Sequence, residues 1–416
     1  MDLNRRRFLK ASVGGSALAV ASAGRAESAQ ARPTVEELDQ AAAEPILKLD
    51  ALKSPVKIAS LELLRNRNGY FVRAASTDGA VGVGIANGRA AYLYPILDQL
   101  VIPYFIGKDA RDLEALVDGV YVYKSNYKLA GLALWNCVAW VEFSLLDLLG
   151  RIAKQSVGEL LGVVVRREAA FYVASGRRDT TPEQEVELLA KTIEETGTRA
   201  IKFKVGGRMS NNRDSMPGRT EGLIALARKR LGDQVAIHAD SNGSYDPPKA
   251  IEIGKRLEAI DAHFFEEPCP FDHLEDTKRV ADALTVPVAG GEQETSLRRF
   301  RWTVHNRGLD IVQPDLHYNG GYIRATRVAR MAARAGMKIT PHISGDLGFI
   351  DVLHFASCTP NLGAYQEYKG GIEKWGPWFD PPVRLKDGAV NVPTGPGLGV
   401  VDPAALLDGA GKIVPE

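Results

Sequence analysis

Ionisable residues recur along the second half of the chain at nearly constant intervals. The series is Asp240, Glu266, Glu292, Asp315, His342 and Glu367, with successive steps of 26, 26, 23, 27 and 25 residues. Each step has room for one strand and one helix, and each residue comes where a predicted strand gives way to a loop. A chance distribution of surface charges would not repeat at the period of a fold. We therefore expect these side chains to lie around one pocket.

Three of these residues, Asp240, Glu266 and Glu292, are carboxylates that follow three consecutive predicted strands. Clustered carboxylates repel one another unless a cation joins them. Because the candidate ligands are all oxygen atoms, the pattern favours a hard divalent ion, most simply one Mg²⁺ per subunit. The alternative is a set of unrelated charges paired to arginines. Asn242 shares a face with Asp240, whereas Glu267 is expected to face away from Glu266 and is left out of the predicted ligand set.

Two lysines, Lys202 and Lys204, occupy the predicted strand "AIKFKV" just before the carboxylate series. Side chains two residues apart on a strand point to the same face. Beside Lys202 and a divalent cation, Lys204 would favour its neutral form, which can accept a proton. A barrel lysine can instead form a Schiff base, but that chemistry needs no carboxylate triad.

A second acid or base is predicted on the far side of the pocket from Lys204. There Asp315 can orient the imidazole of His342 and stabilise its charged form. Glu367 follows on the last predicted strand, where a protonated carboxyl group could donate a hydrogen bond to a developing oxyanion. The pocket is thus expected to hold two separate groups that can move protons.

The elements that must position these residues begin near residue 168. Apolar runs alternate with helical patterns through eight predicted strands, from "AAFYVASG" at 169–176 to "LGAYQE" at 362–367. Strands that are apolar throughout and alternate with helices indicate a parallel α/β sheet, and eight such strands predict a closed barrel. In such a barrel the carboxyl ends of the strands form one ring, which is where active sites lie.

The chain before residue 165 has a different pattern. Residues 55–88 alternate apolar and polar positions around turn signals, which is typical of antiparallel strands. Residues 90–163 have helical spacing, including the apolar stretch at 140–162. These patterns predict an α+β domain. Residues from 374 onward are rich in Pro and Gly and are expected to wrap back over the structure.

Composition argues against a nucleic-acid or membrane protein. The 416 residues carry a net charge of +1, which offers no electrostatic attraction to nucleic acid. The three cysteines are too few and too scattered for a disulfide framework or a zinc site. Beyond the N-terminus no stretch approaches 18 continuous apolar residues, so no stable membrane span is expected.

The first 31 residues have the pattern of an export signal. Basic residues come first, a weakly apolar stretch rich in Gly, Ala and Ser follows, and small-residue sites end it. Residues 5–10, "RRRFLK", resemble the twin-arginine motif. That resemblance implies export of a folded protein to the periplasm through the twin-arginine translocase. The alternative is a disordered basic tail.

The joint pattern of the later motifs resembles the enolase superfamily and, within it, the mandelate racemase subgroup. The residues that carry the resemblance are Lys202-Phe203-Lys204, Asp240-Ser241-Asn242, Glu266-Glu267-Pro268, Gly291-Glu292, Pro314-Asp315, Gly320-Gly321, His342 and Glu367. The helical segment around Asp147 is similar to the one that joins the family's capping domain to its barrel. The resemblance covers residues 52–400.

The resemblance implies an α/β fold, in which a modified TIM barrel of the (β/α)7β type carries an N-terminal α+β capping domain. The expected organisation is a signal peptide at 1–31, a lead-in segment at 32–51, the capping domain at 52–165, the catalytic barrel at 166–373 and a C-terminal segment at 374–416 that packs back on the capping domain. Cap loops near 66–72 and 90–105 are expected to shape the pocket. A homo-oligomer is also expected.

The implied activity is Mg²⁺-dependent removal of the proton α to a carboxylate, through a stabilised enediolate. Lys204 would serve one face of the α-carbon and the His342–Asp315 pair the other, with Lys202 and Glu367 assisting. The residues expected to contact substrate are Lys202, Asn242, His317, Tyr318, Asn319 and Glu367. We favour dehydration of an acid sugar to a 2-keto-3-deoxy acid. The alternatives are a racemase or epimerase and a non-catalytic exported sugar-acid binding protein.

Overall fold

Eight parallel strands form the larger part of the fold. The computed structural model describes residues 32–343, 345 and 347–413, and the predicted export signal at 1–31 lies outside the described residues. The strands are β4 (Glu168–Ala174), β5 (Ala200–Lys204), β6 (Ala236–Asp240), β7 (Phe264–Glu266), β8 (Val288–Gly290), β9 (Ile311–Val312), β10 (Lys338–Ile339) and β11 (Gln366–Tyr368). Each strand from β4 to β9 pairs with the strand that follows it, and β11 pairs with β4. A bridge between Ile339 and Leu362 links β10 to the chain just before β11, which closes the ring.

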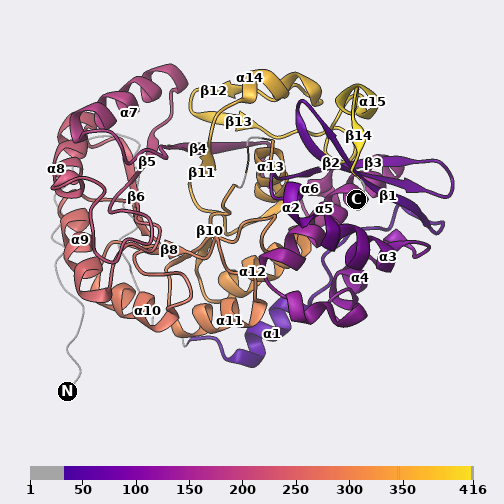
Figure 1. The fold of residues 1–416 in the computed structure, drawn as a ribbon, viewed down its shortest axis with the longest axis horizontal. Coiled ribbons are helices and arrows are strands. Elements are labelled where there is room, and N and C mark those ends of the chain that lie inside the picture. Colours follow the sequence, from indigo (N-terminus) through magenta and orange to yellow (C-terminus); the bar gives the residue numbers. More distant parts are fainter. Residues whose placement is uncertain (1–31, 344, 346, 414–416) are drawn as a thin grey trace, which may run out of the picture. The chain divides into compact units, whose positions relative to one another are not determined.

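Seven helices alternate with these strands and surround them (Figure 1). They are α7 (Pro182–Thr196), α8 (Arg219–Leu231), α9 (Pro247–Ala259), α10 (Leu274–Ala283), α11 (Leu297–Asn306), α12 (Tyr322–Arg334) and α13 (Phe349–Cys358). The strands are almost wholly buried, as expected for a parallel sheet covered by helices. The predicted (β/α)7β barrel is therefore confirmed.

Strand register brings the predicted site residues level with one another. Lys204 lies opposite Asp240 across β5 and β6, and Asp240 lies opposite Glu266 across β6 and β7. A further bridge pairs Asp315 with His342 just beyond β9 and β10. Because all these strands are parallel, their carboxyl ends meet at one face of the barrel. The alternation of short strands and helices therefore determines where the chemical groups gather.

An antiparallel sheet and a group of helices precede the barrel. The strands are β1 (Ile58–Asn66), β2 (Gly69–Ser76) and β3 (Val81–Ala86), and the helical elements are α2 (Ala90–Ile96), η1 (Leu97–Val101), α3 (Ile102–Phe105), η2 (Ala110–Asp112), α4 (Leu113–Gly119), η3 (Tyr123–Leu129), α5 (Leu132–Ala153) and α6 (Val157–Leu161). This arrangement agrees with the antiparallel and helical patterns of the sequence.

Helix α5 packs directly on β3. A Cβ atom at Gly82 or Gly84 would lie 2.4 or 2.5 Å from the helix backbone, so only glycine permits this approach. The helix is long and apolar enough to cross a membrane, but 89% of its most apolar stretch is buried inside the protein. We therefore interpret α5 as a core helix.

Two acidic side chains on α5 join it to distant parts of the chain. Glu142 accepts a hydrogen bond from the Ile323 N–H at the start of α12, and a Cβ atom at Gly321 would collide with this carboxyl group. Burial raises the pKa of Glu142 to about 8. Asp147 accepts from the N–H groups of Val83 and Leu398, at 2.8 Å each. These contacts fasten the cap helix to a barrel helix, a cap strand and the C-terminal segment.

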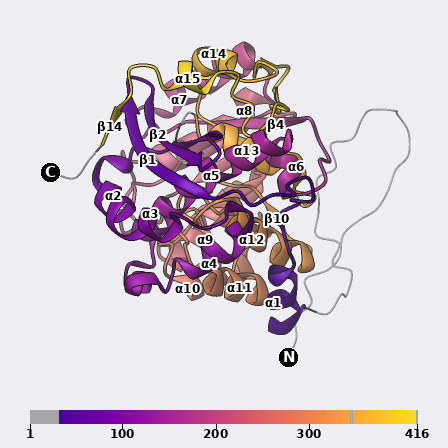
Figure 2. The same cartoon turned by 90° about the vertical axis from the view of Figure 1, so that its right-hand side faces the viewer.

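The C-terminal segment runs along both parts of the fold. Its elements are α14 (Ile372–Trp375), η4 (Gly376–Trp378), β12 (Leu385–Lys386), β13 (Ala389–Asn391), α15 (Pro403–Leu406) and β14 (Gly411–Lys412). Strand β13 pairs with β4 of the barrel, whereas β14 pairs with β1 of the cap sheet (Figure 2). The segment therefore contacts the barrel as well as the cap.

The lead-in segment contains a helix that packs on the barrel. Helix α1 (Val35–Ala43) begins with a capping box in which Thr34 and Glu37 exchange hydrogen bonds. It contacts α12 and α11, and ion pairs join Glu37 to Arg334 and Asp39 to Arg301. The predicted lead-in segment therefore contains a capped helix that ion pairs hold against the barrel.

We predict that Asp147→Ala lowers the free energy of unfolding by about 2–4 kcal/mol, because two buried N–H groups and Arg151 lose their acceptor. Urea denaturation followed by circular dichroism measures this loss. The matched control is Asp118→Ala, which removes a half-exposed partner of Arg327 and should cost no more than about 1 kcal/mol. Equal losses for the two variants would contradict the joining role of Asp147.

Candidate active site

The ammonium group of Lys202 lies at the centre of the polar cluster and is 1% exposed. Its Nζ is 2.7 Å from Glu266 Oε1, 3.1 Å from Glu367 Oε1 and 3.9 Å from Asp240 Oδ2. Burial alone would lower the pKa of Lys202, but Glu266 and Glu367 outweigh that effect and raise it well above its usual range. Lys202 is therefore a permanent cation that holds three carboxylates together.

The second lysine, Lys204, forms an ion pair with Asp240. Burial would raise the pKa of this carboxyl group, but Lys204 and Lys202 outweigh burial and lower it to about 2. The Asn242 side-chain amide donates to Asp240 Oδ2 at 3.1 Å, and the Asn242 backbone N–H donates to Oδ1 at 2.8 Å. The position and the negative charge of Asp240 are thus stabilised by two lysines and by two hydrogen bonds from Asn242.

The carboxyl group of Glu266 lies among more carboxylates than Lys202 alone can neutralise. Burial raises its pKa to about 7, and the neighbouring Asp240, Glu367 and Glu292 add to that rise against the attraction of Lys202. Gln313 donates a hydrogen bond to Glu266 Oε2 at 3.1 Å. A further cation beside these groups would relieve the repulsion.

His342 and Asp315 form the predicted pair. The distance from His342 Nδ1 to Asp315 Oδ2 is 2.6 Å, and Asp315 Oδ1 accepts from the backbone N–H groups of His317 and Tyr318. The other ring nitrogen, Nε2, lies 3.2 Å from Glu292 Oε2. Burial lowers the pKa of His342, but the nearby carboxylates outweigh burial and raise it. Asp315 thus fixes one nitrogen and leaves the other facing the carboxylate cluster.

Glu367 differs from the expectation of a protonated donor. Burial would raise its pKa, but Lys202 and His342 lower it well below its usual range. The group is therefore an ionised acceptor between two cations in this structure, and the predicted donor role would require this carboxyl group to gain a proton. The sequence could not show that Lys202 lies within 3.1 Å of this carboxylate.

Lys369 belongs to the cluster and was missed by sequence reasoning. Its Nζ lies 3.2 Å from His342 Nε2 and 3.5 Å from Glu367 Oε2, and it donates to the Ile343 carbonyl at 2.7 Å. Lys369 directly follows β11 and is two residues after Glu367. The same rule that placed Lys202 and Lys204 on one face of a strand could therefore have predicted that Lys369 lies near Glu367.

Glu267 is also closer to the cluster than predicted. It is 7% exposed, has a backbone φ of 44°, and accepts a hydrogen bond from the Asn242 amide at 3.3 Å. The positive φ breaks the strict alternation of an extended strand, so the side chain remains within reach of Asn242. The expectation that Glu267 faces away from the site was therefore wrong.

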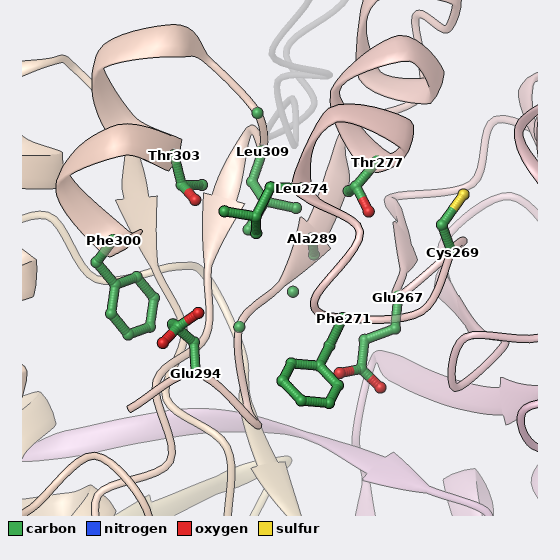
Figure 3. A pocket seen from close by; sticks show the side chains of 13 residues that line it. Glu267, Cys269, Phe271, Leu274, Thr277, Ala289, Glu294, Phe300, Thr303 and Leu309 are labelled. Carbon is green, nitrogen blue, oxygen red and sulfur yellow. The ribbon is translucent and has the colours of Figure 1, made fainter. Parts of the chain in front are cut away.

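A small cavity of about 30 Å³ lies behind Glu267, between α10 and α11 (Figure 3). Phe271, Phe300 and Leu309 line it, together with the carboxyl group of Glu294. Glu267 Oε1 has no hydrogen-bond partner among the described residues. The cavity is large enough for about one or two water molecules and too small for a sugar.

The three loop residues predicted to bind substrate have different surroundings. Tyr318 is the one that lies near His342, with ring centroids 6.2 Å apart, and its hydroxyl accepts from Arg89 of the cap at 3.0 Å. His317 packs edge-on against Phe143 of α5. Asn319 is fully buried and donates to the Glu294 carbonyl. The structure therefore places His317 and Asn319 in the scaffold.

The chemistry of the donor set suits a hard divalent ion. Asp240, Glu266 and Glu292 are buried, follow adjacent strands and offer only oxygen atoms. Within the described residues, however, no three Asp, Glu, His or Cys side chains are arranged to hold one metal ion together. Lys202 and Lys204 pair with these carboxylates in this structure, so metal binding would require the Lys204–Asp240 ion pair to open.

Comparison with known proteins settles the family. A family described as enolase C-terminal domain-like matches residues 184–403, which is more than half of the chain. The N-terminal domain of the mandelate racemase/muconate lactonizing enzyme family matches residues 46–162. The chain belongs to the enolase superfamily. Its capping sheet and barrel correspond to these two matched regions.

Named relatives in the superfamily include sugar-acid dehydratases. The chain is 29% identical to an arabinonate dehydratase of Saccharolobus solfataricus, over 78% of this chain and 85% of that protein. It is 27% identical to an L-talarate/galactarate dehydratase of Salmonella typhimurium, over 78% of each chain.

A solved structure of a mandelate racemase/muconate lactonizing protein from Paracoccus denitrificans, complexed with magnesium, aligns with a TM-score of 0.78 and 25% identity. The alignment covers 86% of this chain and 99% of that chain.

We predict that Lys202→Met lowers the free energy of unfolding by about 3–5 kcal/mol without divalent cations, because Glu266 and Glu367 lose their buried partner. Denaturant unfolding in EDTA measures the loss. The control Lys278→Met removes a partly exposed pair with Asp282 and should change stability by no more than about 1 kcal/mol. Adding Glu266→Gln to Lys202→Met should recover part of the loss. A fully stable Lys202→Met protein would contradict the central role of this ammonium group.

Proposed function

We propose that this protein removes the proton next to a carboxylate and, in acid sugars, eliminates the β-hydroxyl group to give a 2-keto-3-deoxy acid. One observation supports the proposal above all others. Lys204 and the His342–Asp315 pair approach the same carboxylate cluster from β5 and β10, which are not neighbouring strands. Two separate acid/base groups facing one cluster suit proton removal followed by proton delivery.

Lys204 is the proposed base in the dehydration. Once its pairing with Asp240 is released and its ammonium group has given up a proton to solvent, the neutral amine of Lys204 can accept a proton from the α-carbon. Lys202 keeps its charge and stabilises the negative charge that develops on the substrate carboxylate. The two lysines therefore have different tasks, because Lys202 is held by three buried carboxylates and Lys204 by one.

His342 is the proposed acid. Asp315 holds Nδ1, so Nε2 is the nitrogen that can deliver a proton to the departing hydroxide. The raised pKa of His342 favours the charged, proton-donating form near neutral pH. Glu367 lies 3.4 Å from Nε2 and is suited to steady the imidazolium ion rather than to donate a proton.

Asp240, Glu266 and Glu292 are the residues that would hold Mg²⁺. A Mg²⁺ ion bound there supplies Lewis-acid stabilisation of the charge that forms when the α-proton leaves. The proposal is supported by the excess of buried carboxylates and by the magnesium in the similar Paracoccus structure.

Racemisation or epimerisation is the second candidate, because the same two groups can exchange a proton across the α-carbon. The dehydratase names among the relatives favour dehydration. A non-catalytic binding protein would need the cations but not a paired histidine opposite a lysine. We also propose export through the twin-arginine translocase and assembly as a homo-oligomer, on the sequence pattern of residues 1–31 and the family resemblance.

We predict that, with Mg²⁺ in D₂O, the wild-type protein exchanges the α-proton of at least one acid sugar for deuterium. Lys204→Ala and His342→Asn should each lower exchange on one face of the α-carbon by about 10²–10⁴-fold, because each removes one acid/base group. Proton NMR of matched epimers separates the two faces, and formation of keto acid distinguishes dehydration from epimerisation.

The control for this exchange experiment is Lys249→Ala, which removes an exposed lysine paired with Glu252 and should leave both faces unchanged. Full exchange activity in both Lys204→Ala and His342→Asn would refute the assignment of the two groups. Ligand binding with no exchange across a broad panel of sugar acids would favour the binding protein.

We predict that Mg²⁺ stabilises the protein against unfolding, by about 2.7 kcal/mol at a hundred times its dissociation constant. Thermal unfolding with and without Mg²⁺ measures this effect independently of turnover. Glu266→Gln should abolish the stabilisation, whereas Glu252→Gln, at an exposed position, should retain it. A Mg²⁺ response that survives in Glu266→Gln would place the ion elsewhere.

A further inference from the structure

Arg178 is a partly buried cation with no carboxylate partner within ion-pair distance among the described residues. It follows β4 in the chain, and its guanidinium donates from Nε to the Gly206 carbonyl at 3.0 Å and from Nη2 to Asn242 Oδ1 at 2.9 Å. Burial lowers the pKa of Arg178, and the attraction of Asp240 does not restore it. Buried charges in proteins are normally paired, so an unpaired one that is held in place suits an external anion.

Arg178 lines an open hollow of about 800 Å³. Nη1 of Arg178 makes no hydrogen bond with the described protein, whereas Nε and Nη2 are both engaged. Arg177 lines the same hollow and is exposed, with no ion pair to any described residue. Asp179 also borders the hollow, so its lining carries two cations and one anion.

A serine from the loop after β5 also lines the hollow. Ser215 lines the hollow, and its Oγ is buried without a hydrogen-bond partner among the described residues. Two guanidinium groups that line one hollow form a donor set that matches a carboxylate or phosphate group.

The hollow lies at the catalytic face of the barrel. Its walls follow β4 and β5, whose carboxyl ends lie at the same face as Lys202 and Lys204. Arg219 donates to the carbonyls of Thr180 and Arg177 and also to that of Lys204 at 2.8 Å. One buried side chain therefore ties the Arg177–Arg178 loop to the strand that carries the proposed base.

We propose that this hollow binds a second carboxylate at the far end of the substrate, which makes the preferred substrates sugar diacids rather than sugar monoacids. The inference rests on the proposed function, because it assumes that the other carboxylate lies in the cluster around Lys202. Asn242 connects the two sites, since it contacts Asp240 with its amide nitrogen and Arg178 with its amide oxygen.

The test compares sugar acids that differ only at C6, such as galactonate with galactarate and gluconate with glucarate, in the full Mg²⁺-loaded protein. We expect kcat/KM to favour the diacid of a pair by about tenfold or more, as for a charge-assisted contact. Arg177→Gln should lower kcat/KM for the diacid by about tenfold through KM and leave the monoacid unchanged. Arg230→Gln, which removes an exposed arginine paired with Glu187, is the control and should change neither substrate.

Three other results of these experiments would overturn or redirect the inference. Equal turnover of both acids in every pair, with no effect of Arg177→Gln, would overturn the inference. Tighter binding of 6-phosphogluconate than of glucarate would overturn the carboxylate assignment in favour of phosphate. If no acid exchanges its α-proton, the proposed function fails, and calorimetric titration decides the inference separately. A diacid preference in binding that Arg177→Gln removes would then support it.

Discussion

The pocket depends on the balance between buried carboxylates and the few cations that neutralise them. Asp240, Glu266 and Glu367 all lie within 3.9 Å of the single ammonium group of Lys202. In a site shielded from water, each unpaired carboxylate would cost several kcal/mol. Lys202 and Lys204, both on β5, supply positive charge to these carboxylates. The same arrangement leaves Glu266 short of positive charge, and this deficit makes a divalent cation a natural addition.

The backbone of the barrel sets the distances between these charged groups. Register places Lys204, Asp240 and Glu266 level on neighbouring strands, so their separations follow from backbone pairing. Around the barrel, Glu142 and Asp147 of α5 use buried carboxyl groups to fasten the cap to α12 and to the C-terminal segment. Arg89 reaches from the cap to Tyr318, next to His342. The cap therefore contributes to the surroundings of the acid/base pair as well as to stability.

The fold was predictable because its signals repeat. Eight apolar strands alternate with helices, and each strand ends in a polar residue. To predict them, it was enough to read the spacing of apolar side chains and the lengths of the elements. The local geometry of single loops was not predictable. Glu267 departs from strand alternation through a positive φ, and His317 turns to Phe143 although its neighbour Tyr318 lies beside His342. Arg178 was missed because its role depends on a contact between loops far apart in the chain, whereas the position of Lys369 two residues after Glu367 was a signal that went unused.

The most direct measurement is anomalous diffraction from crystals soaked with Mn²⁺ in place of Mg²⁺. The charge balance predicts one peak bounded by oxygens of Asp240, Glu266 and Glu292, with Lys204 displaced from Asp240 and Lys202 still beside Glu266. A peak elsewhere, or none at saturating Mn²⁺ with both lysine pairs intact, would contradict it.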